Sequence, residues 1–305
     1  MYRSVFAFAL LSIFNPGSGL IAQEALLSPS DLDGFRARNI GPAVMSGRIV
    51  DLAVVEKDPR VFYVASATGG LWKTTNNAVT FTPLFGNEAV HSLGDVAVHQ
   101  VDTSLVWLGT GERANRQSSS WGDGVYRSRD GGESWENVGL TDSHHIGRIT
   151  LHPTDPQIVY VAAIGHLWGP NEERGLYKSV DGGESWDRIL FVDEDTGVID
   201  VALDPGNPEI VYAASYQRRR RPFGFHGGGP GSALWKSADG GANWTKLTNS
   251  GLDNGLPAGD MGRIGISVYR SDPRIVYVSV EQGLRYNAST AYEERLAGVY
   301  LSLIH

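Results

Sequence analysis

The chain has 305 residues, and its 26 Lys and Arg against 34 Asp and Glu give a net charge of −8. This acidic balance lacks the basic surface that phosphate binding needs, so no nucleic-acid partner is expected. With 41% hydrophobic residues, the composition also excludes a disordered chain. The absence of cysteine excludes disulfides, thiolate metal sites and cysteine nucleophiles.

The N-terminus has the pattern of an export signal. Arg3 precedes an apolar run over residues 5–14, and Asn15-Pro16-Gly17 ends that run. We therefore expect a cleavable signal peptide over residues 1–22 and a lead-in segment over 23–46. The run is shorter than the roughly 20 apolar residues that span a bilayer. The sequence predicts an exported protein, periplasmic or secreted, with no membrane span.

The rest of the chain is a repeat. Three segments align without gaps, at residues 128–135 (SRDGGESW), 179–186 (SVDGGESW) and 237–244 (SADGGANW), and a worn copy lies at 74–81 (TTNNAVTF). Each is preceded by a second repeated element, of which residues 155–160 (DPQIVY) are one copy. Markers that recur in one order about every 50 residues indicate a repeat architecture.

Each unit divides into four strands. In the third unit they are expected at residues 148–152, 158–163, 175–179 and 186–191, with Asp-Pro and Asp-Gly-Gly marking turns. Four-stranded units of about 50 residues predict an all-β propeller. The expected blades are residues 47–85, 91–138, 147–190, 197–247 and a partial fifth at 262–305.

The pattern Ser-x-Asp-x-Gly-x-x-Trp is the Asp-box, or BNR repeat. Over roughly residues 47–305 the chain resembles the Asp-box propellers of the sortilin-like and YVTN/BNR-like families. In such a turn Asp accepts backbone N–H groups, Gly supplies a positive φ, and Trp fills the space between sheets. We expect this structural role for Ser128, Asp130, Gly132, Trp135, Ser179, Asp181, Gly183, Trp186, Ser237, Asp239, Gly241 and Trp244.

The strands of a blade alternate in direction, so its first and third hairpins lie at one end of the strands and its second hairpin at the other. This strand parity predicts where a ligand binds. Asp-Pro turns and Asp-boxes share one end of the strands, whereas the long, variable insertions share the other end with the links between blades. Aromatic and charged side chains in these insertions suit a sugar or an extended peptide, although ordinary solvated loops fit them as well. The candidate ligand-binding residues are Glu112, Arg113, Arg116, Trp121, Asp123, His166, Trp168, Tyr216, Arg218 and Tyr286.

Three charged clusters are weighed as sites for an anion or a metal ion. The run Arg218–Arg221 can grip an anion, but a solvated loop is the favoured interpretation. Asp193-Glu194-Asp195 and His144-His145 lie in links between blades and lack a convincing ligand spacing. No metal and no cofactor are predicted.

Two enzyme families are tested on their motifs. The xyloglucan hydrolases carry a catalytic Asp in Thr-Asp-x-Gly-Gly of the first blade, and the matching segment 66–70 has Ala67 at that position. Sialidases carry Phe/Tyr-Arg-Ile-Pro near the N-terminus, and Phe35-Arg36 matches only its first two residues. A glycosidase needs two facing carboxylates. Carboxylates on the insertion side are Glu112, Asp123, Glu172, Glu173, Glu281, Glu293 and Glu294.

The expected function is therefore a non-catalytic binding or assembly module that recognises a peptide, a protein or a glycan, and no catalytic residue is assigned. The alternative is a glycoside hydrolase with a carboxylate pair on the insertion side. The fifth unit reaches only residues 298–300, and residues 301–305 look like a translated sequencing adapter. We expect a truncated gene, with further blades of the parent chain as partners.

Overall fold

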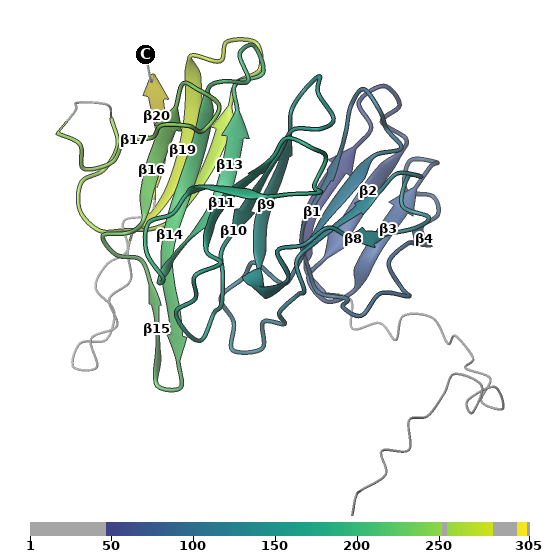
Figure 1. Cartoon of the computed structure of the whole chain (residues 1–305), viewed down its shortest axis with the longest axis horizontal. Helices are drawn as coiled ribbons and strands as arrows, with labels where there is room; N and C mark the ends of the chain where they lie inside the picture. Colours follow the sequence, from purple (N-terminus) through teal and green to yellow (C-terminus); the bar gives the residue numbers. More distant parts are fainter. Residues whose placement is uncertain (1–46, 252–254, 283–297, 304–305) are drawn as a thin grey trace, which may run out of the picture. The chain divides into compact units, whose positions relative to one another are not determined.

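The computed structural model describes residues 47–251, 255–282 and 298–303. These residues form five antiparallel sheets that follow one another along the chain (Figure 1). A single turn of 3-10 helix, η2 (Thr141–Ser143), is the helical element among them. The predicted all-β propeller architecture of four-stranded blades is confirmed.

The first two sheets are meanders of four strands joined in sequence order. Sheet one contains β1 (Ile49–Val54), β2 (Phe62–Ser66), β3 (Gly70–Thr74) and β4 (Thr82–Pro83). Sheet two contains β5 (Leu93–Val98), β6 (Val106–Thr110), β7 (Val125–Ser128) and β8 (Glu136–Asn137).

The remaining sheets repeat this order with local changes. Sheet three contains β9 (Ile146–Leu151), β10 (Val159–Ala163), β11 (Gly175–Ser179) and β12 (Asp187–Leu190). Sheet four contains β13 (Thr196–Leu203), β14 (Val211–Arg221), β16 (Ala233–Ser237) and β17 (Thr245–Lys246), and β15 (Gly224–Gly227) pairs with the extension of β14. Sheet five contains β18 (Met261–Val268), β19 (Ile275–Gln282) and β20 (Gly298–Leu303).

The hydrophobic core lies between consecutive sheets. Each of four buried clusters combines residues of one sheet with residues of the next. Between sheets two and three, for example, the fully buried Trp107 and Val125 pack with Ile146 and Val161. Because both faces of an inner blade are covered, its strands are nearly continuous apolar runs; every residue of β10 is buried.

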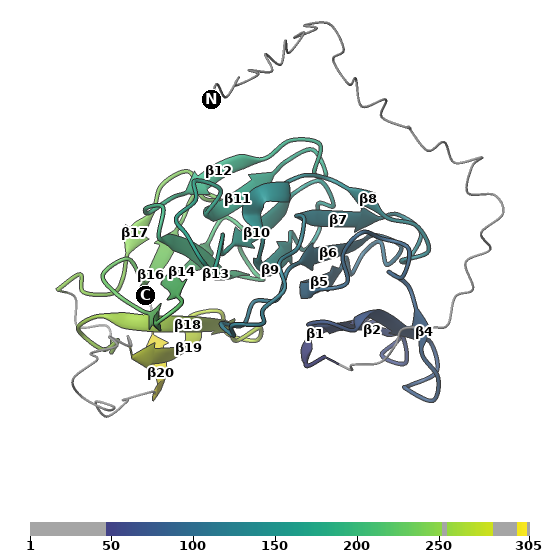
Figure 2. The same cartoon turned by 90° about the horizontal axis from the view of Figure 1, so that it is seen from below.

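The first strands of the sheets lie innermost, as Figure 2 shows for β5, β9 and β13. Arg148 on β9 connects them, because its guanidinium contacts carboxylates of three other sheets. Its Nη1 lies 3.3 Å from Asp95 Oδ1 of β5 and 3.5 Å from Asp51 Oδ1 of β1, and its Nε lies 3.1 Å from Asp200 Oδ1 of β13. One cation thus joins the inner strands of four sheets.

The Asp-box turns contact the preceding sheet. In the third copy, Ser179 Oγ donates to Asp181 Oδ1 at 2.7 Å and accepts from the Gly183 N–H at 2.7 Å. Gly183 has φ +96°, and a Cβ there would lie 2.7 Å from the Trp107 ring of sheet two. Only glycine therefore satisfies both the turn and the close approach.

At two blade boundaries, side chains of the earlier sheet donate hydrogen bonds to the Asp-box of the next sheet. Tyr63 Oη and Lys73 Nζ of sheet one donate to the Gly131 carbonyl in the Asp-box of sheet two, at 3.0 and 2.8 Å. Tyr160 and Lys178 of sheet three do the same to Gly240 of sheet four, at 3.1 and 2.9 Å. The repeated tyrosine and the repeated box are thus partners between neighbours.

The insertions in the second hairpins of sheets two, three and four contact one another. Asn115 of sheet two donates to Tyr216 Oη of sheet four at 2.8 Å. Arg218 Nη2 of sheet four donates to the Gly165 carbonyl of sheet three at 3.2 Å. Among the described residues no helix is long and apolar enough to cross a membrane.

Candidate functional site

A cavity of about 670 Å³ lies along the inner strands of sheets three, four and five. Its charged lining residues are Arg113, Arg148, Asp200, Arg263 and Glu281. Glu281 is at the end of β19 that leads into the insertion of sheet five, and Arg113 is in the insertion of sheet two. The cavity therefore includes residues from the insertion end of the strands, where strand parity predicts a ligand.

The two carboxylates of the cavity differ in their surroundings. Asp200 is nearly buried: Oδ1 accepts from Arg148 Nε at 3.1 Å and from the Val201 N–H at 3.0 Å, and Oδ2 accepts from the Ile266 N–H at 2.8 Å. Glu281 is partly exposed. One carboxylate is thus fixed by the fold, and the other is open to the cavity.

Asp95 is buried and contacts two arginines of the cavity, Arg113 and Arg148. Its Oδ2 accepts from the Ile149 N–H at 2.7 Å. Burial raises the pKa of Asp95 to about 7, against the opposing effect of Arg148 and Arg113. Arg148 in turn has a raised pKa, chiefly because of the charge of Asp95. The carboxyl therefore titrates in the neutral range although it is close to two guanidinium groups.

Arg113 and Glu112 are predicted ligand residues that the structure places toward the inner strands. Arg113 donates to the backbone carbonyls of Val50 and, at 3.1 Å, of Gly147. The buried Glu112 forms an ion pair with Arg48. Both side chains are engaged with the protein, and of the two only Arg113 also lines the cavity.

Tyr216 and Arg218, two of the predicted ligand residues, have fully buried side chains. Asn115 explains their position: it donates to Tyr216 Oη and accepts from Arg218 Nη1, both at 2.8 Å. Burial lowers the pKa of Arg218 to about 9. The two residues connect insertions to each other and present no surface to a ligand.

The solvated-loop interpretation of residues 218–221 is wrong. These residues continue β14 and pair with β15, with Arg218 opposite Gly227 and Arg221 opposite Gly224. Arg219 forms an ion pair with Asp195, and Arg220 donates to the Asn115 carbonyl. Because the strand continues into a hairpin, Arg218, Arg219 and Arg220 each have a partner within the protein, which a solvated loop does not predict.

Four other predicted residues lie on the insertions and do not line the cavity. Arg116 and Trp121 are exposed, and Trp121 has 65% of its surface accessible. Asp123 Oδ2 accepts from Tyr126 Oη at 2.7 Å, so it supports its own hairpin. Trp168 is 47% exposed. Tyr286, Glu293 and Glu294 lie outside the described residues.

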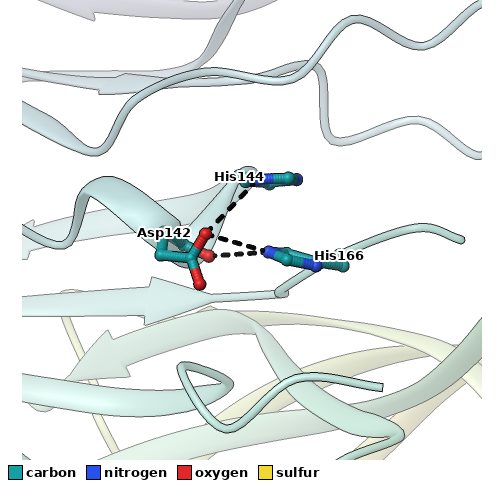
Figure 3. Close-up of side chains that lie close together, drawn as sticks. All are labelled: Asp142, His144 and His166. Carbon is teal, nitrogen blue, oxygen red and sulfur yellow. Dashed lines mark hydrogen bonds and ion pairs between the residues drawn. The ribbon is translucent and has the colours of Figure 1, made fainter. Parts of the chain in front are cut away.

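His166 has a different set of neighbours. Its Nε2 lies 3.4 Å from Asp142 Oδ1 and 3.0 Å from the Asp142 carbonyl oxygen, and His144 Nε2 lies 3.6 Å from the same Oδ1 (Figure 3). The two imidazole rings stack with centroids 3.6 Å apart, and Trp121 stacks on His144 at 5.8 Å. Burial, and next the neighbouring His166, lower the pKa of His144.

This cluster is not evident in the sequence. There His144 stands next to His145, but His145 is buried, and its pKa is lowered by burial and then by Arg218. The true neighbour, His166, is 22 residues away in another loop. Asp142 was not singled out at all. Nothing in the local sequence brings a link between blades together with the insertion of the next sheet.

The chain matches one family model and is similar to several known proteins. The sequence model of the Sortilin-Vps10 family, described as sortilin and neurotensin receptor 3, matches residues 123–290. A xyloglucanase from a Paenibacillus species is 23% identical over 85% of this chain and 26% of its own length. A xyloglucanase from Acetivibrio thermocellus is 23% identical over 77% of this chain and 29% of its own length.

The solved structure of an ancestral GH74 enzyme is 21% identical, with a TM-score of 0.59 over 80% of this chain and 28% of that one. At this identity the likeness supports the fold. The chain spans about a quarter of the length of the curated relatives that it matches. Those relatives are named xyloglucanases, which contradicts the expectation of a non-catalytic binding or assembly module and favours the hydrolase alternative.

Proposed function

The chain belongs to the Sortilin-Vps10 family, and from this premise we propose that it is part of an exported glycoside hydrolase acting on a xyloglucan-type polysaccharide. The names of its curated relatives support this class of substrate. The apolar run at residues 5–14 supports export, since a secreted enzyme meets polysaccharides outside the cell.

The observation that carries the proposal is the pair of carboxylates, Asp200 and Glu281, lining one cavity among the inner strands. Hydrolysis of a glycosidic bond requires one carboxyl group to protonate the leaving oxygen and a second to act as base or nucleophile. We assign Glu281 as the general acid because its side chain is open to the cavity. Asp200, oriented by Arg148 and two backbone N–H groups, is its partner.

Arginines supply the remaining contacts. Arg113, Arg148 and Arg263 line the same cavity, and guanidinium groups donate several hydrogen bonds in a fixed plane. Burial lowers the pKa of Arg263, which marks it as a partly desolvated donor. Such donors bind sugar hydroxyls and hold the chain across the two carboxylates.

Ala67 means that this chain cannot use the catalytic Asp of the xyloglucan hydrolase pattern. It occupies the position of the catalytic Asp in the Thr-Asp-x-Gly-Gly pattern and is almost fully buried after β2. A methyl group supplies neither a proton nor a nucleophile, so this position takes no part in the reaction. The proposed carboxylate pair, Asp200 on β13 and Glu281 on β19, therefore differs from the arrangement that the Thr-Asp-x-Gly-Gly pattern implies.

The test is release of reducing ends from purified xyloglucan by the untagged protein. We expect activity that falls at least about 100-fold in Glu281→Gln, the usual scale for loss of a general acid. Glu133→Gln, an exposed change in an Asp-box turn, is the matched control and retains full activity. Retained binding of xyloglucan by the Glu281→Gln variant separates loss of chemistry from loss of folding. No release by the native chain, or equal release by Glu281→Gln, contradicts the proposal.

A further inference from the structure

We propose that Asp142, His144 and His166 form a binding site for a divalent transition-metal ion, with Zn²⁺ as the best match. One oxygen and two imidazole nitrogens converge: the three ligand atoms all lie within 4.8 Å of one another. Figure 3 shows both Nε2 atoms directed at the same carboxylate. The site lies on the insertion side, and none of its three ligands lines the cavity proposed for hydrolysis.

The distances fit a tetrahedral ion. Zinc binds imidazole nitrogen and carboxylate oxygen at about 2.0–2.2 Å, so ligand atoms around it are about 3.3–3.5 Å apart. Asp142 Oδ1 lies 3.4 Å from His166 Nε2 and 3.6 Å from His144 Nε2. The two rings stack with centroids 3.6 Å apart and an interplanar angle of 20°, so one imidazole has to turn out of the stack before both nitrogen lone pairs meet at the ion.

The chemistry of the donors selects among cations. Two imidazoles and one carboxylate suit zinc and similar transition metals, whereas Ca²⁺ and Mg²⁺ prefer sites made of oxygen. Asp142 has 61% of its side chain exposed. The fourth position therefore opens to solvent and accepts a water molecule, as in zinc sites with three protein ligands.

The backbone around the cluster holds the ligands in place. His144 has φ +57° and Leu140 has φ +55°, so two non-glycine residues in an uncommon conformation flank η2. Asn171 is buried and contacts both loops. Its Nδ2 donates to the Asp142 carbonyl at 3.3 Å, and its Oδ1 accepts from the His166 N–H at 3.0 Å. Asn171 is therefore a positioning residue for two ligands.

The metal would connect two parts of the fold that the sequence separates. Asp142 and His144 lie in the link between sheets two and three, and His166 lies in the insertion of sheet three. Trp121, which stacks on His144, belongs to the insertion of sheet two. An ion at this point fixes the ring of His144 and with it the exposed indole of Trp121 that stacks on this ring.

The experiment is isothermal titration of Zn²⁺ into untagged, chelator-treated protein. We expect one ion per chain, and a visible spectrum typical of tetrahedral coordination when Co²⁺ replaces Zn²⁺. The conservative variants Asp142→Asn and His166→Gln should each weaken binding at least about 100-fold, and Asn171→Ala about 10-fold, as for groups that orient ligands. His91→Ala, which removes another exposed imidazole, should leave binding unchanged.

Thermal unfolding with chelator present checks that the variants remain folded. Binding that is missing, or that is the same in Asp142→Asn, His166→Gln and the native chain, overturns the proposal. The readout is bound metal, so it is independent of the proposed hydrolysis, and either proposal can fail while the other holds.

Discussion

The indole N–H of Trp186 donates to the backbone carbonyl of Val138 at 2.7 Å, across the boundary between sheets three and two. The same contact recurs from Trp244 to Ile189 at 2.9 Å and from Trp135 to Leu84 at 3.1 Å. The last residue of each Asp-box therefore binds the preceding sheet. This makes the box a joint between blades as well as a turn within one.

Trp186→Ala should destabilise the fold. The change removes the hydrogen bond to Val138 and the edge-to-face contact with the Trp107 ring, whose centroid is 6.2 Å away. A large-to-small change of this kind costs about 3–5 kcal/mol. Urea unfolding followed by circular dichroism measures the loss. Trp121→Ala, at an exposed tryptophan, should change stability by less than about 0.5 kcal/mol. An unchanged midpoint in Trp186→Ala would falsify the claim that this tryptophan holds neighbouring blades together.

Asp95 should make stability fall as pH rises toward neutrality. Its pKa is about 7 in the fold, against an ordinary value of 3.8, so the folded state binds the extra proton between about pH 4 and 7. The unfolded state binds fewer protons in that window, and the free energy of unfolding therefore decreases with pH. Urea titrations at pH 5 and pH 8 measure the decrease. It should be smaller in Asp95→Asn, which retains an oxygen for the Ile149 N–H; an equal slope in both proteins contradicts the assignment.

The Asp-box carboxylates should act in the opposite direction at acid pH. Hydrogen bonds from Asn243, and next from Ser237, lower the pKa of Asp239 to about 2. The stability that they supply is complete above about pH 4 and is lost as pH falls through the folded pKa. Asp239→Asn should therefore lower the urea midpoint at pH 7 and bring it closer to the native value near pH 2. Glu133→Gln, in the Asp-box of sheet two, should match the native chain at both values. A midpoint difference for Asp239→Asn that is independent of pH would count against this account.

The fold was predictable because its signals are local and repeated. Gly183 has its positive φ within one turn, and the box around it recurs in register with three others. The site was less predictable because it depends on which loops meet. Tyr216 and Arg218 have the composition of a ligand surface, but Asn115, about 100 residues earlier, buries them. The expectation of a binding module rested in part on Ala67, which lacks the catalytic carboxylate of the xyloglucan hydrolase pattern, and the names of the curated relatives contradict it.

The tyrosine and lysine donors between blades are synthesised before the Asp-box carbonyls that accept from them. Tyr63 and Lys73 are made by the ribosome before Gly131, and Tyr160 and Lys178 before Gly240. Sheets one and three thus present these donors while the acceptor is still to be synthesised. The nascent chain can add blades one after another from its N-terminal end, with every new Asp-box docking on a neighbour that is already folded.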